Sequence, residues 1–321
     1  MTVQPEKILR ELSNLWVDLG HEEGVLRACA MTLIVACEGA DDVMEAGEAV
    51  AELMREHPSR AIVLRVLNET EPRLDSRVFA QCWMPVGRHQ QICCEQIEIS
   101  ATSTRLNDVY SAMLGLTVPD LPVICWLRNA GLLTMPEFQP LLRISRTIIL
   151  DSAALPDAAG ALSAMETART TGWRIKDLSW TRLTRWREIV AQIFENPAMR
   201  ERRISSILVR HSGAEVSVEA WYAAAWLSCR LPGATVRFEP ANRILNNGLQ
   251  GLLLEGPDLH ISILPSSTTA VDVKVDSVYS RVVLAEMPEW RLVKEELSIL
   301  NDDPVFEPAL ELACKLARRD A

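Results

Sequence analysis

The chain has 321 residues, of which 48% are apolar and 24% charged, and these proportions exclude a disordered or fibrous protein. Its 43 acidic residues outnumber its 33 basic residues, and the net charge of −10 argues against a nucleic-acid partner and against an anionic membrane surface. The length predicts two domains, because one domain usually spans about 100–200 residues.

Nothing in the sequence indicates export or membrane insertion. Residues 1–19 lack the cationic start and apolar core of a signal peptide, and apolar runs such as 31–37 are too short to span a bilayer. The eight cysteines include no CxxC motif. We therefore expect a cytoplasmic protein with reduced thiols, and the adjacent Cys93 and Cys94 are interpreted as two buried or edge-strand thiols rather than as a redox switch.

The first part of the chain predicts a helix followed by a strand–helix–strand unit. Apolar residues recur with helical spacing over 6–19, and again over 40–56. Continuous apolar runs at 32–37 and 61–67 indicate buried strands on either side of the second helix. Such a crossover joins parallel strands.

Strands and helices continue to alternate as far as residue 194. The further strands are expected at 78–84, 92–99, 123–127 and 146–150, and the further helices at 106–116, 136–144, 157–169 and 179–194. This alternation predicts an N-terminal α/β domain, residues 1–197, with a parallel or mixed sheet covered by helices.

Asn196 and Pro197, followed by the charged stretch 200–203, form the best linker candidate, after which the pattern changes. Short strands separated by turn residues are expected at 204–210, 236–238, 251–255, 259–264 and 271–275, with helices at 216–228, 289–300 and 304–318. The second domain, residues 198–321, is thus predicted to be α+β with a mostly antiparallel sheet.

Common signatures of catalysis and cofactor binding are missing. The sequence contains no GxGxxG, GxxxxGK[ST], HExxH or GxSxG motif, and its five histidines form no i, i+4 pair. The first strand–helix junction, residues 37–42, is acidic and would repel a phosphate. We therefore expect no catalytic residues, no cofactor and no metal, and do not expect an enzyme.

His57, Ser59 and Arg60 lie between a predicted helix and a predicted strand. They could form an exposed anion-binding site. They could equally form a tight turn in which Pro58 stops the helix, Ser59 bonds to backbone and Arg60 covers the sheet edge. The sequence favours neither interpretation.

Tryptophan is unusually frequent, with nine residues against three tyrosines. Trp126 ends a predicted strand, and Trp180 and Trp186 share one face of a predicted helix that also carries Arg182 and Arg185. Tryptophan and arginine are enriched at the centres of interfaces, so these five residues are candidates for partner binding. The alternative, which the sequence favours, is burial of the rings in the core.

Several motifs in a fixed order resemble the glucose-6-phosphate dehydrogenase assembly protein family, usually called OpcA. They are His57-Pro58-Ser59-Arg60, Leu121-Pro122-Val123, Cys125-Trp126, Asp177-Leu178-Ser179-Trp180, Trp186-Arg187 and Asn301-Asp302-Asp303-Pro304-Val305-Phe306. The resemblance covers nearly the whole chain and is strongest over 24–195. One departure is Leu127, where the family often has a second tryptophan.

The resemblance implies a non-catalytic partner of glucose-6-phosphate dehydrogenase that promotes its active oligomer or raises its apparent substrate affinity, in the oxidative pentose phosphate route to NADPH. Two alternatives stay open. One is a sugar-phosphate sensor or small-molecule enzyme with its anion site at His57, Ser59 and Arg60. The other is a scaffold that binds the dehydrogenase without changing its kinetics.

Overall fold

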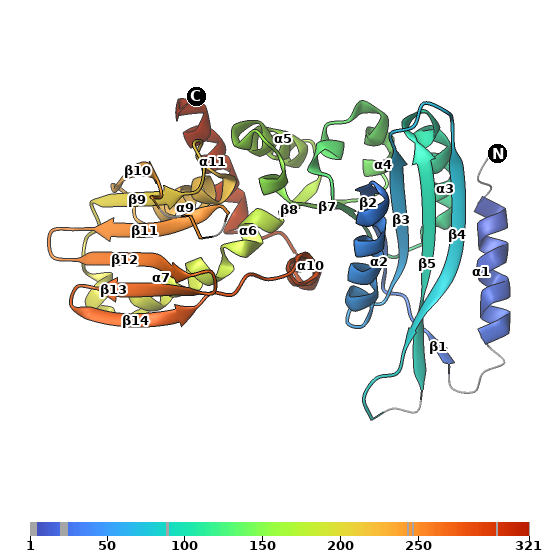
Figure 1. Ribbon diagram of the computed structural model, residues 1–321, viewed down its shortest axis with the longest axis horizontal. Coiled ribbons are helices and arrows are strands. Elements are labelled where there is room, and N and C mark those ends of the chain that lie inside the picture. Colours follow the sequence, from blue (N-terminus) through green and yellow to red (C-terminus); the bar gives the residue numbers. More distant parts are fainter. Residues whose placement is uncertain are drawn as a thin grey trace. The chain divides into compact units, whose positions relative to one another are not determined.

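The computed structural model describes residues 5–19, 25–87, 90–242, 244–245, 247–299 and 301–320 (Figure 1). It divides into two compact units. The first contains Met1–Asp151, Thr171–Lys176 and Glu296–Ser298, and the second contains Ser152–Thr170, Asp177–Glu295 and Ile299–Ala321. The boundary expected at residue 197 therefore lies inside the second unit.

The first unit is built on an eight-stranded sheet with the order β1-β5-β3-β2-β6-β7-β8, in which β4 also pairs with β5. Its strands are β1 (Val25–Arg27), β2 (Met31–Glu38), β3 (Ser59–Leu67), β4 (Leu74–Trp83), β5 (Gln91–Thr102), β6 (Val123–Leu127), β7 (Thr147–Leu150) and β8 (Arg174–Asp177). Strands β2 and β3 are parallel and almost wholly buried. Burial of both faces explains why they read as continuous apolar runs.

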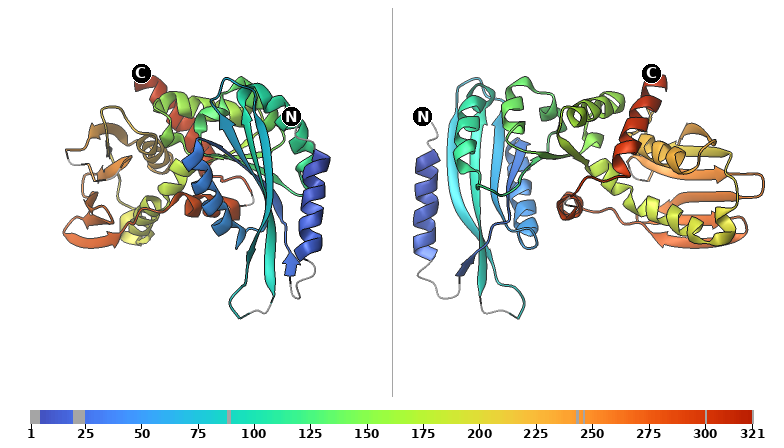
Figure 2. Two further views of the ribbon diagram at one scale, coloured as in Figure 1. Left: turned by 45° about the vertical axis from the view of Figure 1, so that its right-hand side comes forward. Right: turned by 180° about the vertical axis from the view of Figure 1, so that it is seen from behind.

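Helices cover both faces of this sheet. Helix α2 (Ala40–Met54) joins β2 to β3 and packs on both strands, as the strand–helix–strand pattern predicts. Helices α1 (Pro5–Leu19) and α3 (Leu106–Leu116) pack against each other on the opposite face, and α1 runs along β4 (Figure 2). Gly115 of α3 lies so close to Pro5 that a Cβ there would come within 3.1 Å of the proline ring.

The antiparallel pair β4–β5 holds a disulfide between Cys82 and Cys93, which face each other directly in the ladder. The expectation that all thiols are reduced is therefore wrong for these two residues. Sequence spacing hides the pairing, because the two cysteines come together only through the register of the hairpin. The neighbouring Cys94 is a free, buried thiol, as expected.

A buried carboxylate, Glu95, ties together four elements of the first unit. It accepts hydrogen bonds from the Trp16 indole (2.6 Å) and the Arg60 guanidinium (2.5 Å), and it pairs with Arg27 at 2.5 Å. Arg60 also donates to the Leu116 carbonyl. A buried acid is tolerable only when it is paired in this way, so Glu95 joins α1, β1, β3 and β5.

The second unit is built on a six-stranded sheet with the order β10-β9-β11-β12-β13-β14. The strands are β9 (Ser206–His211), β10 (Thr235–Pro240), β11 (Leu249–Glu255), β12 (His260–Ser267), β13 (Ala270–Val275) and β14 (Val278–Val283). All neighbours are antiparallel except β9 and β10. Helix α9 (Val218–Arg230) packs on β9 and β11, and α11 (Phe306–Asp320) packs on α9 and on α5 (Ala158–Thr170).

The predicted fold class is confirmed: a largely parallel sheet with helices, then a mostly antiparallel sheet. The short strands β1 and β8 were not predicted, because runs of three or four residues carry almost no periodicity. The exposed edge strand β14 lacks an alternating buried face and was missed too. The helix predicted over 289–300 is α10 (Glu289–Ser298), and residue 300 lies outside the described residues.

Among the described residues, no helix has both the length and the apolar character that a membrane crossing requires.

Replacing Glu95 with alanine should lower the free energy of unfolding of the first unit by about 3–5 kcal/mol, because it leaves the Arg60 cation, 8% exposed, without its carboxylate. Replacing Arg27, whose side chain is half exposed, should cost less than about 1 kcal/mol. Hydrogen exchange of β3 and β5 amides in urea would measure both. Equal costs would show that Glu95 does not join the four elements as described.

Candidate functional site

Asp177, the first residue of the Asp177-Leu178-Ser179-Trp180 motif, is the buried centre of a hydrogen-bond cluster in the second unit. It is 1% exposed and caps helix α6 (Leu178–Arg182) by accepting from the Ser179 backbone N–H at 3.0 Å. Its carboxylate also accepts from the Ser152 backbone N–H (3.1 Å), the Ser152 hydroxyl (2.5 Å) and the Tyr222 hydroxyl (2.8 Å). One side chain therefore starts α6 and attaches it to α9.

Trp180 joins two motifs that are more than a hundred residues apart in sequence. Its indole N–H donates to the Asp303 carboxylate at 3.0 Å, and its ring lies 5.7 Å from the Phe306 ring, centroid to centroid. The Arg187 guanidinium carbon stacks 3.7 Å from the Trp180 ring centroid. Asp303 also accepts from the Val305 backbone N–H, so this acid both orders the turn before α11 and holds the Trp180 ring.

The helix predicted over 179–194 is two helices, α6 and α7 (Thr184–Glu195), which are separated at Leu183. Trp180 and Trp186 are buried, at 3% and 7% exposure. Arg182 is half-buried, 3.9 Å from the Glu219 carboxylate, and Arg185 is exposed and pairs with Glu188 at 2.9 Å. The two tryptophans therefore hold the helices in place, and the arginines supply the accessible groups.

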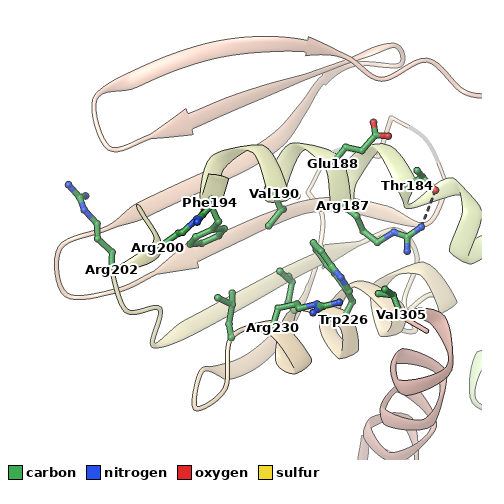
Figure 3. A pocket seen from close by; sticks show the side chains of 13 residues that line it. Thr184, Arg187, Glu188, Val190, Phe194, Arg200, Arg202, Trp226, Arg230 and Val305 are labelled. Carbon is green, nitrogen blue, oxygen red and sulfur yellow. Dashed lines mark hydrogen bonds between the residues drawn. The ribbon is translucent and has the colours of Figure 1, made fainter. Parts of the chain in front are cut away.

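A pocket of about 610 Å³ lies between α7 and α9 in the second unit (Figure 3). Val190 and Phe194 project from α7 toward Trp226 and Arg230 of α9. Its full lining is Thr184, Arg187, Glu188, Val190, Ala191, Phe194, Arg200, Arg202, Trp226, Leu227, Arg230, Leu231 and Val305. Two of these, Arg187 and Val305, belong to the motifs that resemble the OpcA family.

The pocket combines an apolar interior with four arginines. Arg202 is paired with Asp276 at 2.6 Å, and Arg187 is stacked on Trp180 and donates to the Thr184 hydroxyl. Arg200 donates to the Phe194 carbonyl at 3.0 Å. The sequence did not predict this site, because the pocket forms only when α7 and α9 meet, and the charged stretch at 200–203 was interpreted as part of a linker.

The structure does not bring His57, Ser59 and Arg60 together as an open site: His57 and Arg60 have separate partners, and Ser59 is buried. Ser59 and Arg60 are buried, and Arg60 is bound to Glu95 and to the Leu116 carbonyl. His57 is half-buried, with its ring 3.4 Å from the Ser298 hydroxyl. The Arg60 charge is thus already neutralised, and this arrangement resembles the tight turn more than an exposed anion site.

Trp126 is completely buried at the carboxyl end of β6, beneath Arg128. The acidic junction after β2 is filled by a network of charged and polar side chains: Arg128 binds Asp42 and Glu45, and Asn129 donates to Glu38. An incoming phosphate would meet these carboxylates at the place where an open parallel sheet usually holds its ligand. Asp41 belongs to the same junction, and its side chain lies outside the described part of the structure.

No group of three metal-binding side chains occurs among the described residues. Burial raises the pKa of Cys37 and Cys125 to about 12 and that of Cys314 to about 11. These thiols therefore stay protonated near neutral pH and are poor nucleophiles and poor metal ligands.

The Asp177–Tyr222 contact predicts a stability effect. Replacing Tyr222 with phenylalanine should lower the free energy of unfolding of the second unit by about 1–3 kcal/mol, because a hydrogen bond to a buried carboxylate is lost. Hydrogen exchange of α9 amides would measure it, with the exposed Tyr279→Phe as control. An equal effect from both variants would contradict the role given to Asp177.

The same contact predicts a pH dependence. Burial, followed by the Asp177 charge and hydrogen bond, raises the pKa of Tyr222 well above its usual value of 10. The folded state therefore binds the phenolic proton more tightly than the unfolded state does. Stability from this group is complete below about pH 10 and falls as the pH rises further.

Buried cysteines such as Cys314 also have a raised pKa in the folded state, so their contribution to the free energy of unfolding falls over an overlapping alkaline range. The readout is therefore the difference in unfolding free energy between the wild-type chain and Tyr222→Phe, measured from pH 8 to about pH 11. We expect this difference to be constant up to about pH 10 and then to shrink. A difference that grows with pH would contradict a raised pKa of Tyr222.

Curated relatives of the chain are cyanobacterial proteins. The chain is 26% identical over 198 residues to the protein named OpcA in Nostoc punctiforme. The aligned region covers 59% of the chain and 41% of that protein. It is 28% identical over 158 residues to the protein named OpcA in Synechocystis sp. This aligned region covers 48% of the chain and 33% of that protein. The chain thus matches less than half the length of either relative.

Several solved structures with a similar course of the backbone are oxidoreductases. They include KijD10, a 3-ketoreductase from Actinomadura kijaniata, with a TM-score of 0.49, 10% identity, and coverage of 90% of this chain and 96% of that one. Biliverdin reductase from Synechocystis sp. has a TM-score of 0.45, 10% identity, and coverage of 90% and 98%. TM-scores below 0.5 at 10% identity support no inference from the function of those enzymes to that of this chain.

Two family profiles match the chain side by side. The profile described as the glucose-6-phosphate dehydrogenase subunit N-terminal domain matches residues 50–167, and the profile of the corresponding C-terminal domain matches residues 173–310. Together they include Trp126, the cluster around Asp177 and Trp180, and the whole lining of the pocket. The chain belongs to the OpcA family.

Proposed function

We propose that the chain is a non-catalytic partner of glucose-6-phosphate dehydrogenase that binds this enzyme and promotes its active oligomer. The observation that carries the proposal is the match of both dehydrogenase-subunit profiles, in order, over residues 50–167 and 173–310. The related cyanobacterial proteins are named for the OxPP cycle, which fits a role in the oxidative pentose phosphate pathway and NADPH supply. The site of action would be the cytoplasm.

An activator of this kind works by binding the active form of the enzyme more tightly than the inactive form. A difference of about 1–3 kcal/mol changes apparent affinity roughly 5- to 150-fold. The chain needs no reacting groups of its own for this, only a surface that fits one state of the dehydrogenase.

The helices α6 and α7 are our proposed contact surface. Arg185 is exposed and Arg182 is half-buried, so both guanidinia can reach a partner. Trp180 and Trp186 lie beneath them and hold the two helices in position. Trp126 is buried at a strand end in the other unit, and a contribution from it to binding would be through packing.

The charged network at the β2–α2 junction supports a role without a dinucleotide. Glu38, Asp42 and Glu45 occupy this junction and are held by Asn129 and Arg128. The alternative of an anion sensor at His57, Ser59 and Arg60 is less well supported, since Glu95 already neutralises Arg60.

The contact surface is tested with Arg182→Ala/Arg185→Ala. We expect the concentration that gives half-maximal activation of the cognate dehydrogenase to rise at least about fivefold, because two cationic contacts are lost. The matched control is Arg237→Ala/Arg319→Ala, two exposed arginines outside this surface, and it should activate normally.

Loss of Arg182 also leaves the buried Glu219 without one of its neighbours and could weaken the fold. The single variant Arg185→Glu, at an exposed position, avoids this problem and should weaken activation in the same direction. Unchanged activation by a folded Arg185→Glu variant together with a folded double variant would reject this surface.

A further inference from the structure

The pocket between α7 and α9 has an interior made almost entirely of carbon. Phe194 and Val190 line it from α7, and Trp226, Leu227 and Leu231 line it from α9 and the residue that follows it. Its volume of about 610 Å³ lies in the range of sites that enclose a ligand or a few large side chains. Trp226 is only half-buried, so an aromatic face remains available at the pocket.

Charge at the rim of this pocket is opposite to that of the chain. Four arginines and one glutamate line it, whereas the chain carries a net charge of −10. Glu188 is engaged by Arg185, and Arg202 by Asp276. Within the described ranges, neither Arg200 nor Arg230 has a carboxylate within ion-pair distance. Two exposed guanidinia therefore remain for carboxylates from outside.

We propose that this pocket holds a segment of glucose-6-phosphate dehydrogenase in which one bulky apolar side chain is flanked by acidic residues. The apolar side chain would fill the space between Phe194 and Trp226, and two carboxylates would bind Arg200 and Arg230. This proposal rests on the function proposed above and adds the chemistry of the partner segment.

The composition of the pocket favours a peptide over a small phosphate. A free sugar phosphate is strongly hydrated and needs several donors inside its site, whereas here the donors lie around an apolar interior. An apolar side chain gains from leaving water, and arginine forms bidentate pairs with carboxylates. Tryptophan and arginine together also dominate the energetics of many protein interfaces.

Two further observations connect the pocket to the motif cluster. Arg187 lines the pocket while it stacks on Trp180, and Val305 lines it two residues after Asp303, which accepts from the Trp180 indole. An occupant of the pocket would therefore contact Arg187, which stacks on Trp180, and Val305, whose backbone N–H is bound to Asp303. This gives the Trp180 cluster a role in recognition in addition to folding.

The test is a binding titration of the cognate dehydrogenase with the full chain, by isothermal calorimetry or biolayer interferometry. The variant Arg200→Glu/Arg230→Glu should raise Kd by at least about tenfold, because both carboxylate contacts become repulsive. The matched variant Arg237→Glu/Arg319→Glu carries the same change in charge at two exposed positions that do not line the pocket, and it should shift Kd less than about threefold. A second variant, Ala191→Trp, would fill the pocket from an exposed position on α7 and should also weaken binding.

The outcomes separate the two proposals. If the wild-type chain binds the dehydrogenase but Arg200→Glu/Arg230→Glu and Ala191→Trp bind equally well, the pocket assignment is overturned and the proposed function stands. If the wild-type chain fails to bind, both are overturned. A third outcome is that glucose 6-phosphate binds the wild-type chain, displaces the dehydrogenase from it, and no longer binds the Arg200→Glu/Arg230→Glu variant. In that case the pocket is a small-anion site and the peptide assignment is wrong.

Discussion

The second unit depends on one buried carboxylate, that of Asp177. It is 1% exposed and accepts from two backbone N–H groups and from the hydroxyls of Ser152 and Tyr222. A charge this deep is stable only with such a set of donors, so its partners must stay in place. The start of α6 is thereby fixed relative to α9. Trp180, three residues further along, then reaches Asp303, just before α11, and Phe306, the first residue of α11.

The pocket between α7 and α9 depends on the contacts of Asp177. Because α6 and α9 are held by Asp177, α7 begins at Thr184 with Arg187 against Trp180, and its inner residues face Trp226. The result is an apolar, arginine-rimmed pocket on a chain whose overall charge is acidic. The first unit has an analogous carboxylate in Glu95, which joins α1, β1, β3 and β5. In the first unit Arg60 is buried against Glu95 and is not available to a partner, whereas Arg200 and Arg230 are exposed at the surface.

Sequence patterns predicted the fold class and most of the longer elements, because buried parallel strands and amphipathic helices each leave a clear periodicity. They did not predict the disulfide between Cys82 and Cys93, which depends on hairpin register, or the break at Leu183, whose apolar spacing continues through both helices. The motif around Asp177 was recognised by resemblance, but its contacts with Tyr222 and Ser152 are long-range. For the candidate contact residues, the sequence could not separate buried from exposed members: Trp180 and Trp186 are in the core, and Arg185 is at the surface.

The central claim is that the chain binds the dehydrogenase and shifts it toward an active oligomer. Mass photometry of the cognate enzyme, mixed with increasing amounts of the chain and assayed for activity in the same samples, tests it most directly. We expect a complex at micromolar concentration or below, with activity and the population of the larger oligomer rising together to saturation. Absence of a complex at micromolar concentration, with unchanged activity and subunit number, would contradict the claim.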